Sequence, residues 1–249
     1  FDPAKVTNMV NQWIVGEVER TISSITPVLE AYKFNEAAGG AYEFVWGVFC
    51  DWYLELSKPT LIGDDEEAKS ETRATIAWVL DQILKILHPF MPFITEELWA
   101  QMVTHGVKRR ALLTLSEWPE VNGLLNAKAD EEIGWIIRLV SEVRSVRSEM
   151  NIPGGAQIPL VVIGDAAKIR ARVERNEETI KRMSRLDDIS FSKTAPKGAD
   201  LFVVGETTFA APLGGVIDMA AERKRLAKEI ASAESDLAKM DAKLANPKC

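Results

Sequence analysis

The chain has 249 residues, enough for one large domain or two modest ones with a buried core. Hydrophobic residues make up 47% and charged residues 27%, as in a globular protein, and no apolar run approaches the roughly 20 residues of a membrane-spanning helix. The formal net charge is −7, opposite in sign to that of most free nucleic-acid-binding domains. Any binding of nucleic acid would therefore need a local basic patch.

Cysteine and histidine usage excludes two kinds of site. Cys50 and Cys249 are too few for a disulfide framework, which indicates a reducing, cytoplasmic compartment. With His88 and His105 as the only histidines, we expect no metal site. The chain opens Phe1-Asp2-Pro3 without an initiator Met or a signal sequence, so we expect a segment cut from a larger protein.

The first two predicted helices are long and apolar. Apolar residues recur at intervals of three and four over residues 6–32, which predicts an amphipathic helix that Pro27 would kink or split. Residues 35–57 are apolar nearly all round, which is typical of a helix packed against several neighbours. We expect Lys58-Pro59 to end this helix. Its glycines, Gly39, Gly40 and Gly47, would fit close helix packing, although Gly in a helix costs about 1 kcal/mol relative to Ala.

Three further helices complete the predicted bundle. Gly63-Asp64-Asp65 precedes a third helix with an apolar stripe over residues 76–87. A stiff apolar turn, His88–Pro92, leads to a short helix through Thr95–Trp99, and residues 130–150 form a fifth helix with its apolar side inward. We interpret His88 as a structural residue of the turn rather than as an acid or base.

The composition changes at Asn151–Gly155, where a small α+β unit is predicted to begin. Residues 158–163 have the pattern of a buried strand and residues 166–183 that of a helix. Short strands are predicted at 189–193, 201–204 and 207–211.

The last segment has a heptad period. Its apolar residues are spaced 4, 3, 4, 3 and 4 apart, which predicts a coiled-coil helix. They are Leu226, Ile230, Ala233, Leu237, Met240 and Leu244. The chain stops where an antiparallel hairpin would turn back, so we expect a truncated arm that frays or pairs with another helix.

The residues show no catalytic constellation, because no phosphate-binding Gly-rich loop, Ser/His/Asp set or metal-ligand spacing occurs. Trp46, Trp52 and Tyr53 could stack on unpaired bases, but in so apolar a helix we favour core packing. Two groups of basic residues could follow a phosphate backbone, although a solvated helix face is the competing interpretation. They are Arg138, Arg144 and Arg147 on one helix, and Arg223, Lys224, Arg225 and Lys228 at the start of the heptads.

Three blocks resemble the anticodon-binding domain of the valyl-tRNA synthetase family. They are Phe-Asn-Glu-Ala-Ala at 34–38, Phe-Cys-Asp-Trp-Tyr-Leu-Glu at 49–55, and the block His-Pro-Phe-Met-Pro-Phe-Ile-Thr-Glu-Glu-Leu-Trp at 88–99. The isoleucine and leucine enzymes share looser forms of them. Residues 143–153, residues 212–218 and the heptad segment ending at 244–247 favour the valine family. The resemblance covers essentially the whole chain.

The resemblance implies a part of a class Ia synthetase that joins valine to its tRNA using ATP and edits threonine. ATP and Mg²⁺ would belong to the catalytic domain, so we expect no cofactor in this chain. The family's His-Ile-Gly-His and Lys-Met-Ser-Lys-Ser signatures are absent, and the partial likeness of Lys181–Arg185 to the second is a chance match, because the family's loop precedes the bundle. The expected partners are the tRNA for valine and the catalytic and editing domains. The whole enzyme would be monomeric and cytoplasmic, without a membrane partner.

The resemblance also implies two sets of tRNA contacts. We predict anticodon contacts from the exposed side of residues 51–58, namely Asp51, Leu54, Glu55 and Lys58, since unpaired bases are read by stacking and by hydrogen bonds to their edges. We predict contacts to the tRNA backbone from Arg144, Arg147, Arg223, Lys224, Arg225 and Lys228. An upstream helix of the bundle, with further anticodon contacts, is expected to precede this chain.

The predicted fold is mainly α. A helical anticodon-binding bundle spans residues 1–150, a small α+β unit spans 151–217, and a truncated coiled-coil arm spans 218–249. Two alternatives remain open. One is a helical scaffold that dimerises through its heptads, and the other is the equivalent region of an isoleucyl- or leucyl-tRNA synthetase.

Overall fold

The computed structural model describes residues 1–104, 111–164, 166–213 and 219–244. The chain divides into two compact units, residues 1–137 and 138–249, and the division falls within a single long helix, α6 (Ala127–Glu149). The predicted mainly α fold with a small α+β unit is confirmed. The predicted three-part division at 150 and 217 stays a prediction. Among the described residues, no helix has both the length and the apolarity needed to cross a membrane.

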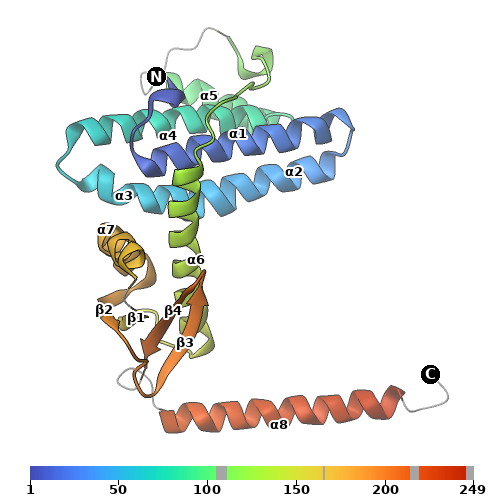
Figure 1. The fold of residues 1–249 in the computed structure, drawn as a ribbon. Helices are drawn as coiled ribbons and strands as arrows, with labels where there is room; N and C mark the ends of the chain where they lie inside the picture. The colour runs from blue at the N-terminus through green and yellow to red at the C-terminus, as the bar shows by residue number, and fades with distance from the viewer. Residues whose placement is uncertain (105–110, 165, 214–218, 245–249) are drawn as a thin grey trace. The chain divides into compact units, whose positions relative to one another are not determined.

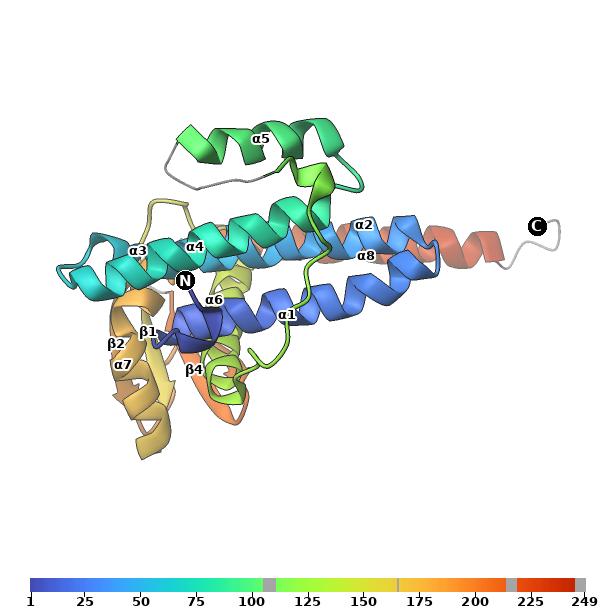
Figure 2. The same ribbon diagram turned by 90° about the horizontal axis from the view of Figure 1, so that it is seen from above.

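The first unit is an antiparallel helical bundle. Helix α1 runs one way, a continuous rod of three helical segments returns, and α4 reverses again with α5 packed on it (Figures 1 and 2). The elements are η1 (Pro3–Lys5), α1 (Met9–Glu30), α2 (Phe34–Tyr42), η2 (Glu43–Tyr53), α3 (Leu54–Ile62), α4 (Glu66–Leu87), α5 (Pro92–Thr104) and η3 (Leu113–Leu115). Segments α2, η2 and α3 form the rod, and η2 is a π-helix.

Local sequence signals set the ends of these helices. The side chain of Asn8 accepts a hydrogen bond from the backbone N–H of Val10 at 2.9 Å and caps α1, and Asp65 caps α4 in the same way. Pro92 begins α5, as is common for proline at the first helical position. The predicted short helix at Thr95–Trp99 is therefore longer at both ends. His88 Nδ1 lies 2.8 Å from Thr95 Oγ1 and joins the end of α4 to α5.

Two prolines stand inside helices. Pro27 does not end α1, which continues three residues further to Glu30, and the proline ring is exposed. The prediction that Lys58-Pro59 ends the second helix is wrong. Helix α3 continues to Ile62, and the N–H of Gly63 donates to the carbonyl of Pro59 at 2.9 Å. The missing proline N–H affects only the last turn of this helix, so one lost hydrogen bond does not stop it.

The second unit contains the end of α6 and a four-stranded sheet in the order β2-β1-β4-β3. Its other elements are β1 (Ile158–Ile163), α7 (Ala167–Ser184), β2 (Leu186–Ser192), β3 (Ala199–Val204) and β4 (Thr207–Pro212). Strands β1 and β2 are parallel and α7 connects them, whereas β3 and β4 form a hairpin whose turn residue Gly205 has a φ of 61°. All the predicted strands are present, and β2 begins three residues earlier than predicted (Leu186 rather than Ile189).

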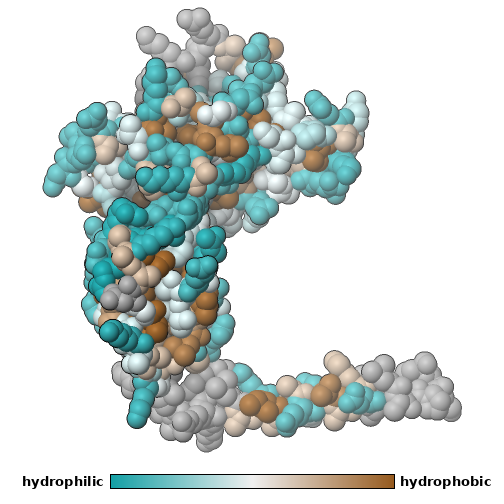
Figure 3. All heavy atoms as spheres, in the orientation of Figure 1, coloured by the Kyte–Doolittle hydropathy of each residue, from teal (hydrophilic) through white to brown (hydrophobic). Residues whose placement is uncertain are grey.

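Helix α8 (Met219–Leu244) confirms the predicted helix at the heptads. All side chains over residues 227–241 are exposed, including the seam residues Ile230, Leu237 and Met240. Figure 3 shows apolar side chains among hydrophilic ones along this helix. The pairing of this seam with a second helix stays a prediction.

Candidate functional site

The rod formed by α2, η2 and α3 carries a row of exposed and half-exposed side chains at four-residue intervals. We call this row the η2 ladder, and it consists of Tyr42, Trp46, Cys50, Leu54, Lys58 and Ile62. Tyr42 and Trp46 are 66% and 57% exposed. The four predicted anticodon-contact residues lie in the later half of this surface. Asp51 and Lys58 are exposed, and Leu54 and Glu55 are half-buried.

The π-helical segment explains why residues four apart share one face. In an α-helix, a step of four residues rotates the side chain by about 40° around the axis. The i to i+5 hydrogen bonds of η2 widen each turn and offset this rotation. On the inner side of η2 the buried residues are Phe44, Phe49 and Tyr53, spaced five and four apart. Both faces therefore follow a period longer than 3.6.

The prediction that the aromatic residues of this segment pack in the core is half correct. Tyr53 is fully buried and Trp52 is half-buried, as expected for core packing. Trp46 contradicts the prediction, because more than half of its side chain is exposed. An α-helical period leaves the segment without a solvent face, and the wider π-helical turn provides one.

A buried polar network fixes the ladder to the rest of the bundle. The hydroxyl of Tyr53 donates to Asn11 Oδ1 at 2.8 Å, and Asn11 Nδ2 donates to Glu71 at 2.8 Å and to Thr72 Oγ1 at 3.1 Å. These bonds connect η2 with α1 and α4. Burial raises the pKa of Tyr53, so its hydroxyl remains a donor.

Glu71 completes this network at the start of α1. Its carboxylate accepts hydrogen bonds from the backbone N–H and the hydroxyl of Thr7 at 2.9 and 2.7 Å, and from the N–H of Asn8 at 2.9 Å. Burial raises the pKa of Glu71, but the hydrogen bonds from Asn11 and Thr7 outweigh it and hold the pKa below its ordinary value. The hydrogen-bond network of Tyr53, Asn11 and the Glu71 carboxylate therefore fixes η2, which carries part of the ladder, to α1 and α4.

The charged groups on and beside the ladder suit base edges better than phosphates. Lys58 Nζ lies 2.5 Å from Glu55 Oε1, so the two charges compensate each other, and Asp51 and Glu43 are exposed carboxylates. Carboxylates repel phosphates but accept hydrogen bonds from the amino groups of bases. Together with two exposed aromatic rings, this surface can stack on unpaired bases and bond to their edges.

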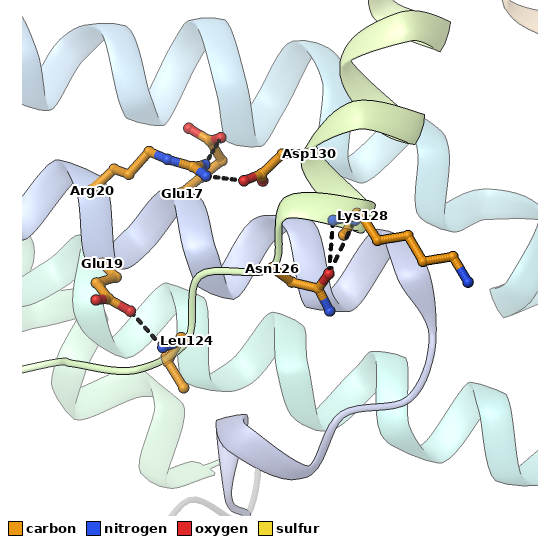
Figure 4. A network of polar contacts seen from close by, with 8 residues as sticks. Glu17, Glu19, Arg20, Leu124, Asn126, Lys128 and Asp130 are labelled. Atoms are coloured by element: carbon orange, nitrogen blue, oxygen red, sulfur yellow. Dashed lines mark hydrogen bonds and ion pairs between the residues drawn. The ribbon is translucent and has the colours of Figure 1, made fainter.

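The start of α6 is fixed to α1 by a second network (Figure 4). Arg20 bridges Glu17 and Asp130, and Glu19 accepts a hydrogen bond from the N–H of Leu124 at 2.5 Å. The side chain of Asn126 caps α6 by accepting from the N–H groups of residues 128 and 129 at 3.1 Å. Burial raises the pKa of Glu17, although Arg20 opposes this.

The predicted backbone-binding residues occupy different environments. Arg144 is exposed, and its Nε donates to the carbonyl of Met183 at 3.4 Å. Arg147 is 8% exposed and donates to the carbonyls of Pro153 and Ala156 at 3.2 and 2.8 Å. Lys228 is exposed on α8. Arg223, Lys224 and Arg225 belong to the same helix, but their side chains lie outside the described residues. The phosphate contacts of this set stay a prediction.

Comparison with known proteins adds a family and several relatives. The anticodon-binding domain of tRNA ligase matches residues 11–162. The valine–tRNA ligase of Nitrobacter winogradskyi is 48% identical over 274 residues, which cover 99% of this chain and 28% of that protein. The valine–tRNA ligase of Mesorhizobium japonicum is 50% identical over 237 residues, covering 95% of this chain and 26% of that protein. The chain thus spans about a quarter of the length of the curated relatives it matches.

Proposed function

Because the chain belongs to the family of anticodon-binding domains of tRNA ligases, we propose that its helical bundle binds the anticodon stem-loop of a tRNA and that the η2 ladder contacts the unpaired bases. The observation that carries this proposal is the pair of exposed aromatic rings, Tyr42 and Trp46, on a rod fixed from below by the Tyr53–Asn11 hydrogen bond. The two rings lie on neighbouring turns of one rod, and single-stranded nucleic acid is bound by stacking of its bases on such rings.

The contacts proposed for the ladder follow from its chemistry. Tyr42 and Trp46 supply stacking faces, and Asp51 and Glu55 supply acceptors for base amino groups. Lys58, at the far end and paired with Glu55, supplies a donor. Leu54 lies between them and offers an apolar contact to a base face. The phosphate backbone would be held by Arg144 and the basic start of α8, which includes Arg223, Lys224, Arg225 and Lys228, while the buried Arg147, close to Arg144 in sequence, would add positive charge.

The proposed parent activity is that of the relatives, which are named valine–tRNA ligases. The tRNA is then the one that accepts valine, the ATP- and Mg²⁺-dependent chemistry belongs to the catalytic domain of the whole enzyme, and editing belongs to a separate domain. In this division of labour the chain contributes recognition and no catalytic group. The α8 seam, if it pairs two copies, would instead support a dimerising scaffold, which sedimentation at several concentrations detects as a rise in mass.

The test is a fluorescence-anisotropy titration of the full 249-residue chain against the tRNA for valine. The same tRNA with altered anticodon bases serves as the competitor. Trp46→Ala should weaken binding by roughly 5- to 150-fold, the equivalent of about 1–3 kcal/mol for one stacked base. Trp46→Phe should retain most of the affinity. Phe93→Ala, which removes an exposed ring from α5, is the matched control and should bind normally. If wild type, Trp46→Ala and the altered anticodon all bind equally, the proposal is wrong.

A further inference from the structure

A basic pocket lies in the second unit, away from the proposed η2 ladder in sequence. It has a volume of about 550 Å³ and is lined by the end of α7, the start of β2 and the loop between α6 and β1. Lys181, Arg182 and Arg185 contribute three cations, and Glu178 contributes one carboxylate. Glu177 lies 2.6 Å from Lys181 and compensates part of this charge. Among the lining residues, the three cations outnumber the one carboxylate.

Cations at the C-terminal end of a helix are common, because they offset the negative end of the helix dipole. This effect alone explains cations at the end of α7, namely Lys181, Arg182 and Arg185, without any bound anion. Arg185, however, adopts a left-handed backbone with a φ of 55°, and its guanidinium turns to the carbonyl of Gly154 in the α6–β1 loop. This arrangement holds a charged side chain against the rim of the pocket.

Arg147 adds a buried positive charge next to the loop that lines the pocket. It is nine-tenths buried, and its Nη2 donates to the carbonyls of Pro153 and Ala156 in the same loop. Its Nη1 is buried without a hydrogen-bond partner among the described residues. Arg147 and Arg185 donate to carbonyls of the same loop, and burial together with the charge of Arg185 lowers the pKa of Arg147. Within the described part of the chain, neither Arg147 nor Arg185 forms an ion pair.

We propose that this pocket, which we call the Arg185 pocket, binds a phosphate group of the tRNA backbone. Arg182 and Arg185 would hold the phosphate oxygens through their planar guanidinium groups, which match a phosphate in bidentate geometry. Arg147 stands behind the loop as a fixed positive charge. The proposal rests on the proposed tRNA-binding function and adds Arg182, Arg185 and the 153–157 loop to its contact surface. Such a contact carries no sequence information, because every nucleotide offers the same phosphate.

The test measures tRNA affinity of the full chain over a series of salt concentrations. Arg182→Gln/Arg185→Gln should weaken binding roughly tenfold at low salt and lower the slope of log K against log salt by about 1 per lost phosphate contact. The matched control is Lys193→Gln/Lys197→Gln, which removes the same charge from exposed positions of this unit outside the pocket. Equal slopes for the two double variants would overturn the proposal.

Two further measurements keep the result decisive. Arg182→Lys/Arg185→Lys preserves charge, so it should keep the slope but lose affinity, and circular dichroism verifies that each variant is folded. Inorganic phosphate is titrated in parallel, with the arginine Nε–H resonances as readout. If phosphate shifts them while the tRNA slope is unchanged in Arg182→Gln/Arg185→Gln, the pocket serves a free anion and the tRNA proposal is overturned. If Trp46→Ala loses anticodon dependence while the arginine variants match their control, only the pocket proposal fails; if wild type binds no tRNA, both fail.

Discussion

The η2 ladder and the Arg185 pocket differ in almost every property that matters for binding a nucleic acid. The ladder carries two exposed aromatic rings with the carboxylates of Glu43, Asp51 and Glu55 beside it, and lies on a helical rod with a buried polar support. The pocket is cationic and is built around a loop that two arginines hold in place. Carboxylates near the rings would repel phosphates from the ladder, and guanidiniums that hold phosphate oxygens read no base identity.

This contrast also explains how a chain with a net charge of −7 can serve a polyanion. Binding energy from phosphates depends on where cations gather rather than on the sum over the chain. The acidic residues beside the ladder contribute to the negative net charge of the chain. They also repel phosphates, so that this surface favours contacts to bases. An acidic total charge is therefore compatible with two surfaces that divide base contacts and backbone contacts between them.

Loss of the buried polar support has the largest expected effect on the ladder. Asn11→Ala leaves the hydroxyls of Tyr53 and Thr72 without their partner in the core. Each unsatisfied buried group costs about 1–3 kcal/mol, so we expect the free energy of unfolding to fall by about 2–4 kcal/mol. Urea denaturation followed by circular dichroism measures this loss. Tyr53→Phe, which removes one hydroxyl and leaves Asn11 bonded to Glu71 and Thr72, is the milder control, and an equal loss from both would contradict the network.

A second prediction separates the two surfaces by their response to salt. Tyr42→Ala should weaken tRNA binding by about 1–3 kcal/mol if its ring holds one base. The slope of log K against log salt should stay that of wild type, because no phosphate contact is lost. Titrations at 50 and 200 mM salt are sufficient. A change of slope in Tyr42→Ala would mean that the ladder also contacts the tRNA phosphates. This result would contradict the proposed division between base contacts and phosphate contacts.

The sequence predicts the two regions unequally well. Apolar periodicity locates α1, α4, α6 and α7, and a short bounded apolar run locates β1, because each follows a standard pattern. No such rule identifies a π-helix, so the outward turn of Trp46 cannot be derived from a 3.6-residue period. The role of Asn11 is equally unpredictable from the sequence, since a polar residue on an apolar helix face does not indicate which side chains it will bond to.

The Arg185 pocket is beyond prediction for a different reason. Arg147, the 153–157 loop and Arg185 meet only because β1 and β2 are parallel neighbours and α7 returns the chain between them. Lys181–Arg185 stands out in the sequence as a likeness to a nucleotide-binding loop, whereas the structure makes it the end of α7 and the start of a different basic surface. Strand order, which local sequence does not specify, decides the composition of this site.

A third prediction concerns pH and acts on the ladder's support alone. The pKa of Glu71 in the folded chain lies below its ordinary value of 4.5, so its contribution to stability is present above that pH and disappears as the pH falls through the lower folded value. We expect the melting temperature of wild type to fall more steeply below about pH 4.5 than that of Glu71→Gln. Glu67→Gln, on the exposed side of the same helix, is the control and should follow wild type. Parallel curves for Glu71→Gln and wild type would contradict this role.

The smallest effect compares two adjacent glycines of the rod. A Cβ added at Gly39 meets no atom within 4 Å, so Gly39→Ala should stabilise the bundle by about 0.5–1 kcal/mol through helix propensity alone. A Cβ at Gly40 would lie 3.3 Å from Cγ1 of the buried Ile25, where α2 packs on α1. Gly40→Ala should gain less or become destabilising, because a well-packed core has little room to yield. Melting curves of both variants measure the difference, and an equal gain would show that the rod is less tightly seated on α1 than these contacts indicate.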